Sequence, residues 1–212
     1  MKKYITEFIG TFFLVLTIGL TNNVLAIGAA LMVMIYAGGH ISGAHYNPAV
    51  TLAVFIRKRI AASDALIYMA SQIAGALIAG LLVSIFIELP DKASESFFVI
   101  KKALLGEFLG TFALAYVVLN VATVKANEGN SYFGLAIGFT VFTMASALGQ
   151  FSGGAFNPAV AVGIIVMNII KFGSIWVYLV ACFGGAAIAA ILFNAINPDE
   201  KRPITGPEDK IA

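Results

Sequence analysis

The sequence predicts an all-α membrane protein with six transmembrane helices and two re-entrant half-helices, arranged as two inverted repeats. Composition, the lengths of the apolar segments and an internal repeat all lead to this fold class. Of the 212 residues, 60% are hydrophobic and 11% are charged, whereas a soluble globular domain has roughly 25% charged residues. Six spans of about 20 residues each leave room for loops and termini, but not for a large soluble domain.

The apolar segments fall into two length classes. Six are long enough to cross a bilayer, at about residues 4–21, 24–41, 65–87, 103–124, 132–150 and 174–194. Two more, at 47–56 and 157–169, are too short to cross roughly 30 Å of hydrocarbon at 1.5 Å per residue. We expect these two to be half-helices that enter and leave the membrane on the same side. Glu7 interrupts the first apolar run, which argues against a cleaved leader.

The chain repeats itself. The segment from Glu7 to Phe12 returns from Glu107 to Phe112, at an offset of 100, and the segment from Ser42 to Val50 returns from Ser152 to Val160, at an offset of 110. Each half holds three spans and one half-helix. Because three is odd, the second half must enter the membrane from the opposite side, so the repeats are inverted. We expect one channel-forming domain over 1–196, with repeats at about 1–99 and 100–196, and a polar cytoplasmic tail at 197–212.

The distribution of positive charge predicts the orientation. With the N-terminus inside, nine Lys and Arg residues lie on the cytoplasmic side and four on the other, which follows the positive-inside rule. The nine are Lys2, Lys3, Arg57, Lys58, Arg59, Lys125, Lys201, Arg202 and Lys210; the four are Lys92, Lys101, Lys102 and Lys171. We therefore expect a multi-pass protein of the cell (inner) membrane with both termini in the cytoplasm.

Two Asn-Pro-Ala motifs, Asn47-Pro48-Ala49 and Asn157-Pro158-Ala159, open the two half-helices. Asn is a preferred helix N-cap and Pro a preferred first helical residue. Two helix N-termini that meet at the midplane would each carry about +0.5 charge. Together they would oppose a cation at about 4 Å by roughly 4 kcal/mol at an effective dielectric constant near 20. A neutral hydroxylated solute avoids this barrier and can bind the asparagine amides, so the motifs predict a pore.

With these motifs the sequence resembles the aquaporin and aquaglyceroporin superfamily, the major intrinsic proteins. The resemblance covers about residues 4–196 and includes the paired Glu-Phe-x-Gly-Thr signatures and the approach from Gly39 to His45. It implies six tilted helices around two half-helices, one pore in each subunit and a homotetramer. Selectivity in such pores depends on diameter, hydrogen-bonding groups and electrostatic barriers.

One position departs from the family. Members usually carry Arg directly after the second Asn-Pro-Ala, as part of a narrow outer selectivity filter, and here that residue is Val160. Distances along the chain from the motifs assign the other filter positions to Ile27, Ala145 and Gly154. This set has no charge and no aromatic ring, so it predicts a wide, apolar filter.

We therefore expect a passive channel for small uncharged solutes such as glycerol-like polyols, urea or metalloid hydroxides such as arsenite, with water also passing. A water-selective aquaporin is an alternative if a neighbouring side chain narrows the filter. A secondary transporter and a non-conducting structural protein are further alternatives. A transporter would normally have an ion-coupling carboxylate near its binding site.

Two glutamates, Glu7 and Glu107, lie within the predicted spans, and His45 lies two residues before the first Asn-Pro-Ala motif. Backbone groups of a non-helical segment inside the membrane need hydrogen-bond partners, so we expect the two glutamates to accept bonds from the neighbouring segments. We expect His45 to brace its loop or line the lumen, although its titration range leaves pH gating open. Cys182 lies in an apolar run and is expected to be a buried small hydrophobe.

Several classes of function are excluded by what the sequence lacks. The net charge of +2 is scattered, with no basic patch for nucleic acid. No glycine-rich phosphate loop, catalytic nucleophile–base pair or metal-binding cluster is recognisable, so we expect no enzymatic activity, no catalytic residue, no metal and no cofactor. The expected partners are the lipid bilayer, water and small neutral solutes.

Overall fold

The computed structural model describes residues 1–91 and 99–198, and the regular elements in this part of the chain are all helical. The elements are α1 (Lys2–Leu20), α2 (Val24–Ser42), α3 (Pro48–Ile56), α4 (Ala62–Phe86), α5 (Ile100–Thr123), η1 (Lys125–Asn127), α6 (Phe133–Ser152), α7 (Pro158–Val166), η2 (Phe172–Ser174) and α8 (Ile175–Ile196). Lys92 and most of the polar tail, which the charge argument used, lie outside the described residues.

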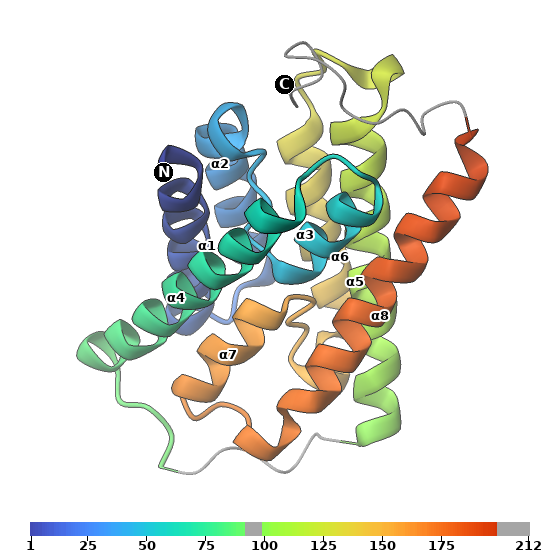
Figure 1. The fold of residues 1–212 in the computed structure, drawn as a ribbon. Helices are drawn as coiled ribbons and strands as arrows, with labels where there is room; N and C mark the ends of the chain where they lie inside the picture. Colours follow the sequence, from blue (N-terminus) through green and yellow to red (C-terminus); the bar gives the residue numbers. More distant parts are fainter. Residues whose placement is uncertain (92–98, 199–212) are drawn as a thin grey trace.

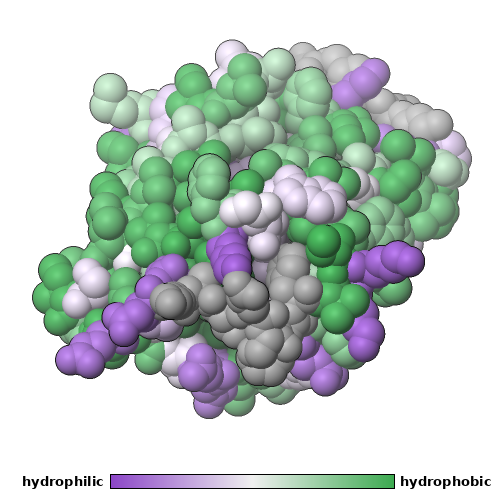
Figure 2. All heavy atoms as spheres, turned by 90° about the horizontal axis from the view of Figure 1, so that it is seen from below, coloured by the Kyte–Doolittle hydropathy of each residue, from purple (hydrophilic) through white to green (hydrophobic). Residues whose placement is uncertain are grey.

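Six of the described helices are long and apolar enough to cross a membrane, which confirms the predicted number of spans. Large hydrophobic side chains such as Leu66, Ile85 and Val180 are more than half exposed on their outer surfaces, as expected where lipid is the solvent. Figure 2 views the molecule from the end opposite the N-terminus, and its hydrophilic side chains gather over part of that end while hydrophobic ones occupy much of the rest.

Several element boundaries differ from the prediction by two or three residues; for example, α4 begins at Ala62 and not near residue 65. Helix α5 begins at Ile100, so Lys101 and Lys102 lie on its first turn and not in the preceding loop. Helix α7 ends at Val166, three residues before the predicted end, because Asn168 adopts a left-handed conformation with φ 56°. The equivalent residue after α3, Lys58, has φ 61°. A left-handed residue cannot continue a right-handed helix, so the backbone ends both half-helices in the same way.

The two repeats pack in the same manner (Figure 1). Helix α1 packs along α4, α5 packs along α8, and α2 crosses α6. Close contacts between helix backbones recur at equivalent places: a Cβ at Gly75 would lie 2.5 Å from Phe8 O, and a Cβ at Gly185 would lie 2.4 Å from Phe108 O. Only glycine permits these approaches, which are typical of packing between membrane helices.

The half-helices α3 and α7 meet in the middle of the molecule, between the long helices (Figure 1). Helix α3 lies toward the face where α1 begins, which we name the N-terminal face, and α7 lies toward the opposite face. Their N-termini point at one another. The fold therefore brings the two Asn-Pro-Ala motifs, separated by 110 residues in sequence, to one place.

Candidate functional site

Each asparagine of the two motifs caps its own half-helix. Asn47 Oδ1 accepts hydrogen bonds from the backbone N–H groups of Ala49, at 2.8 Å, and Val50, at 3.4 Å. Asn157 Oδ1 accepts the equivalent bonds from Ala159, at 2.9 Å, and Val160, at 3.4 Å. The proline that follows each asparagine has no N–H to satisfy. Both half-helices therefore begin abruptly at a capped N-terminus.

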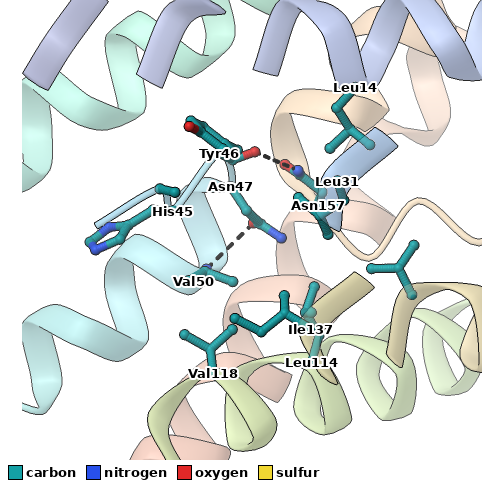
Figure 3. A pocket seen from close by; sticks show the side chains of 12 residues that line it. Leu14, Leu31, His45, Tyr46, Asn47, Val50, Leu114, Val118, Ile137 and Asn157 are labelled. Atoms are coloured by element: carbon teal, nitrogen blue, oxygen red, sulfur yellow. Dashed lines mark hydrogen bonds between the residues drawn. The ribbon is translucent and has the colours of Figure 1, made fainter. Parts of the chain in front are cut away.

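The two caps also bond to each other's loop. Asn47 Nδ2 donates to Phe156 O and Asn157 Nδ2 donates to Tyr46 O, both at 2.9 Å. Figure 3 shows the two asparagines side by side at the edge of a cavity that both of them line. An amide nitrogen carries two N–H donors, so each asparagine uses one to tie the loops together and has a second for a solute. The positive ends of two helix dipoles face the same point.

A buried glutamate accepts hydrogen bonds from each loop. Glu7 Oε1 accepts from Ser42 Oγ, at 2.6 Å, and from the backbone N–H of His45, at 3.0 Å, while Oε2 accepts from the N–H of Tyr46, at 2.7 Å. Neither this side chain nor that of Glu107 is exposed. The carboxylate supplies acceptors for N–H groups that have no helical partner, which is the requirement for irregular backbone at this depth.

Glu107 repeats the arrangement in the second half. Its Oε1 accepts from Ser152 Oγ, at 2.6 Å, and from the N–H of Ala155, at 2.9 Å, and its Oε2 accepts from the N–H of Phe156, at 2.6 Å. The Sγ atom of Cys182, which is fully buried, lies 3.6 Å from the same Oε2. Cys182 therefore faces a carboxylate as well as the apolar packing that the sequence suggested.

Sequence reasoning missed a polar cluster behind the first loop. Gln72 Nε2 donates to Glu7 Oε2, at 2.8 Å, and to Thr51 Oγ1, at 3.0 Å. Thr51 Oγ1 lies 3.1 Å from His45 Nδ1 and donates to Asn47 O, at 3.0 Å. A glutamine within an apolar span is a signal that could have identified this cluster, because buried amides need partners. Figure 3 shows the His45 ring directed away from the cavity, while the backbone of this residue borders it.

The residue before each asparagine has a strained backbone. Tyr46 and Phe156 adopt left-handed conformations, with φ 49° and 47°, which are uncommon for bulky side chains. Their rings lie against glycines of the two Glu-Phe-x-Gly-Thr signatures: a Cβ at Gly10 would lie 2.1 Å from Tyr46 Cε1, and one at Gly110 would lie 2.2 Å from Phe156 Cε1. The signature thus combines a glutamate that bonds to the loop with a glycine that receives the ring.

The cavity beside the asparagines has a volume of about 20 Å³, and about 10–15 Å³ suffices for one water molecule. Apart from the loop residues 44–47 and Asn157, its walls are aliphatic. The aliphatic residues are Leu14, Leu31, Val50, Leu114, Val118, Ile137 and Val141. A passage of this kind offers hydrogen bonds along one edge only. A charged solute that entered it would lose water molecules of its hydration shell, and the aliphatic walls provide no polar groups to replace them.

The four predicted filter residues occupy α2, α6, the second loop and α7. Ile27, Ala145 and Gly154 are partly exposed, whereas Val160 is 3% exposed. Gly154 has φ 66°, and a Cβ at this position would lie 3.1 Å from Gly149 Cα and 3.5 Å from Ala145 Cα. Gly154 and Ala145 are therefore close neighbours. Among the described residues, no group of three or more His, Cys, Asp and Glu side chains is placed to hold a metal ion.

Comparison with known proteins agrees with this geometry. The sequence is 35% identical to the glycerol uptake facilitator protein-like 6 of Lactiplantibacillus plantarum, over 94% of this chain and 100% of the relative. It is 36% identical to aquaporin NIP1-1 of Oryza sativa subsp. japonica, over 93% of this chain and 75% of the relative. The X-ray structure of the aquaglyceroporin from Plasmodium falciparum has the same fold, with a TM-score of 0.78 at 22% identity over 94% of this chain and 98% of that chain.

The family model described as Major intrinsic protein matches residues 1–193, which include both half-helices and nearly all of the six spans. Members of this family are channels and not enzymes. The chain therefore belongs to the major intrinsic protein family and is an integral, multi-pass membrane channel of the aquaporin superfamily.

Proposed function

We propose that this protein is a passive channel for small uncharged solutes, namely glycerol-like polyols, urea or metalloid hydroxides, and that water also passes. The observation that carries the proposal is the charge-free set Ile27, Ala145, Gly154 and Val160 beyond the paired asparagine caps. An aliphatic filter without arginine leaves more room and adds no fixed positive charge. Size and neutrality, more than specific hydrogen bonds, would then determine which solutes enter.

The paired caps support the exclusion of cations. Both half-helix N-termini face the cavity, and the Asn47 and Asn157 amides present donors and not acceptors to it. A cation meets the positive ends of two dipoles, and the side-chain oxygens of both asparagines are already engaged, because each Oδ1 atom accepts from its own helix. A neutral hydroxyl group can accept from the amides. The name of the Lactiplantibacillus relative, glycerol uptake facilitator protein-like 6, is consistent with a polyol as solute.

The experiment compares wild-type protein with Val160→Arg in proteoliposomes, by stopped-flow light scattering with water, glycerol, urea and a metalloid acid. We expect wild type to pass glycerol and at least one other solute. Arginine adds bulk and charge to the filter, so we expect the variant to lose about tenfold or more of its solute flux while retaining more of its water flux. A wild type that passes water alone, or an arginine without effect, would contradict the proposal.

Val160→Leu is the matched control, because it adds volume without charge. A loss of solute flux in both variants would assign the effect to the width of the filter. A loss of solute flux in Val160→Arg alone would assign it to the charge of the arginine. Liposomes that contain no protein give the background permeability. Flux that does not saturate and ignores proton and sodium gradients separates a channel from a transporter.

We further propose that the described residues form one domain of two inverted repeats, and that Glu7, Glu107 and His45 brace the two loops. The positive-inside argument supports an N-terminal face in the cytoplasm, and we place the protein in the cell membrane. The family resemblance supports a homotetramer with one pore in each subunit. Cross-linking in native membranes and accessibility labelling of single cysteines introduced at residues 2 and 23 would test assembly and orientation.

A further inference from the structure

The inverted repeat gives each proposed filter residue a counterpart on the other side of the asparagine pair. Helices α2 and α6 cross at equivalent glycines: a Cβ at Gly28 would lie 2.6 Å from Gly138 O, and a Cβ at Gly138 would lie 2.5 Å from Gly28 O. The crossing is reciprocal, so the offset of 110 residues describes the structure as well as the sequence. Ile27 and Ile137 directly precede these glycines and are therefore equivalent positions.

The same offset relates all four positions. We name the set beyond the asparagines the outer ring and its counterpart on the N-terminal side the inner ring. The outer ring is Ile27, Ala145, Gly154 and Val160, and the inner ring, in the same order, is Ile137, Ile35, Ala44 and Val50. Two of the four pairs differ in residue type. Each difference gives the inner ring the larger side chain, isoleucine for alanine and alanine for glycine.

The inner ring is also less accessible. Its residues are buried, with exposed fractions of 6% for Ile137, 2% for Ile35, 6% for Ala44 and 2% for Val50. In the outer ring only Val160 is buried to this degree. Three inner-ring residues, Ala44, Val50 and Ile137, line the cavity of about 20 Å³. Figure 3 shows Val50 close to Asn47, and Ile137 across the cavity near Leu114.

These observations locate the tighter part of the passage. A volume of about 20 Å³ accommodates a water molecule, and a polyol is larger, so we expect its passage to require displacement of the aliphatic side chains that line the cavity. Isoleucine and valine have a restricted χ1, and tightly packed surroundings limit their displacement further. The inner ring has three such residues and one alanine, whereas the outer ring has two of them with an alanine and a glycine, so the inner ring resists widening more. The size limit should therefore depend on the inner ring.

We propose that the inner ring of Ile35, Ala44, Val50 and Ile137 is the size sieve of this channel, on the N-terminal side of the asparagine pair, and that the outer ring is a wider entrance. The inference rests on the proposed function as a solute channel. It assigns the specificity for solute size to four residues outside the predicted filter. The solutes it favours are slender polyols and amides, which can turn an apolar edge to the aliphatic wall and a hydrogen-bonding edge to the asparagines.

The test uses the equivalent isoleucines as a matched pair. Ile137→Ala and Ile27→Ala make the same change in side chain at positions related by the repeat. Permeabilities to glycerol, erythritol and ribitol are measured in proteoliposomes at equal protein density, with water as reference. We expect Ile137→Ala to raise the ribitol-to-glycerol permeability ratio at least fivefold, and Ile27→Ala to change it less than twofold.

Val50→Ala is the second inner-ring variant, for the case that Ile137→Ala does not yield folded protein, and its match is Val160→Ala. A larger change in the ratio for the outer variants, equal changes in both rings, or no change in either would overturn the proposal. If wild type passes only water, the proposed function fails separately. In that case, the size sieve is supported if only the inner-ring variants admit glycerol. It is overturned if the outer-ring variants admit glycerol or if no variant does.

Discussion

The two loops that precede the half-helices have the same shape but different surroundings. Asn47 and Asn157 have φ of −158° and −159°, and Tyr46 and Phe156 differ in φ by only 2°, at 49° and 47°. Behind the first loop, Gln72, Thr51 and His45 form a connected polar cluster with Glu7. The equivalent positions in the second half are Cys182, Ala161 and Ala155.

This difference separates what sets the loop geometry from what adds stability. The features present in both halves are a glutamate, a serine, two backbone N–H donors, an asparagine cap and a glycine beneath a ring. Together with a tyrosine hydroxyl that donates to the serine carbonyl in each half, Tyr68 to Ser42 O and Tyr178 to Ser152 O, they suffice for the conformation, because the second loop lacks the amide and threonine partners of the first. In the first half, Gln72 and Thr51 add hydrogen bonds to Glu7 and to Asn47 O, which the shared features already hold in position. We therefore expect the second loop to depend more heavily on its glutamate.

The largest expected effect follows from Glu107→Gln. The amide replaces one carboxylate oxygen by a donor, which faces N–H or O–H donors and leaves a buried group unsatisfied, at a cost of about 1–3 kcal/mol. Because Cys182 offers only a weak thiol donor and Ala161 offers none, we expect the yield of monodisperse protein in detergent to fall further than for Glu7→Gln. Flux per correctly folded channel should change less than yield. Normal yield with abolished flux would contradict a bracing role.

Glycine beneath the ring is the next test, and here the two halves should behave alike. Gly10→Ala and Gly110→Ala each place a Cβ within about 2.2 Å of a ring carbon, and such overpacking costs roughly 1–3 kcal/mol. We expect both to lower the thermal midpoint in detergent by similar amounts. Gly149→Ala in α6 is the control, because a Cβ there meets no atom within 4 Å. Tolerance of either substitution would show that the ring can move.

The smallest expected effect compares two buried hydroxyl groups. Thr51→Val leaves His45 Nδ1 and Gln72 Nε2 with one partner fewer, so we expect a loss of about 1–2 kcal/mol. Thr111 Oγ1 is buried, and its contact with the Cys182 thiol is too weak to satisfy the hydroxyl, so Thr111→Val should be neutral or slightly stabilising. The stability of both variants is measured from thermal unfolding in detergent, monitored by size-exclusion chromatography. Equal changes in stability would mean that the hydrogen bonds of Thr51 Oγ1 add nothing to the stability of the first half.

The sequence by itself determined the fold class and the position of nearly every element. Span number, the half-helices and the inverted repeat follow from hydrophobic length and internal repetition, because lipid permits few spanning structures. The capping role of Asn47 and Asn157 is also local, since an Asn-Pro pair satisfies the first turn of its own helix. The premature end of α7 was missed because an apolar run does not reveal the left-handed turn at Asn168.

Only the tertiary structure decided how the two halves meet. The bonds from each asparagine to the opposite loop join residues about 110 positions apart, and no local pattern specifies a partner at that distance. The Gln72 cluster, the glycines that receive the Tyr46 and Phe156 rings, and the crowding of the inner ring likewise come from helices that are distant in sequence. A sequence pattern records the face that a helix buries, whereas the width of a passage depends on how several such faces pack together.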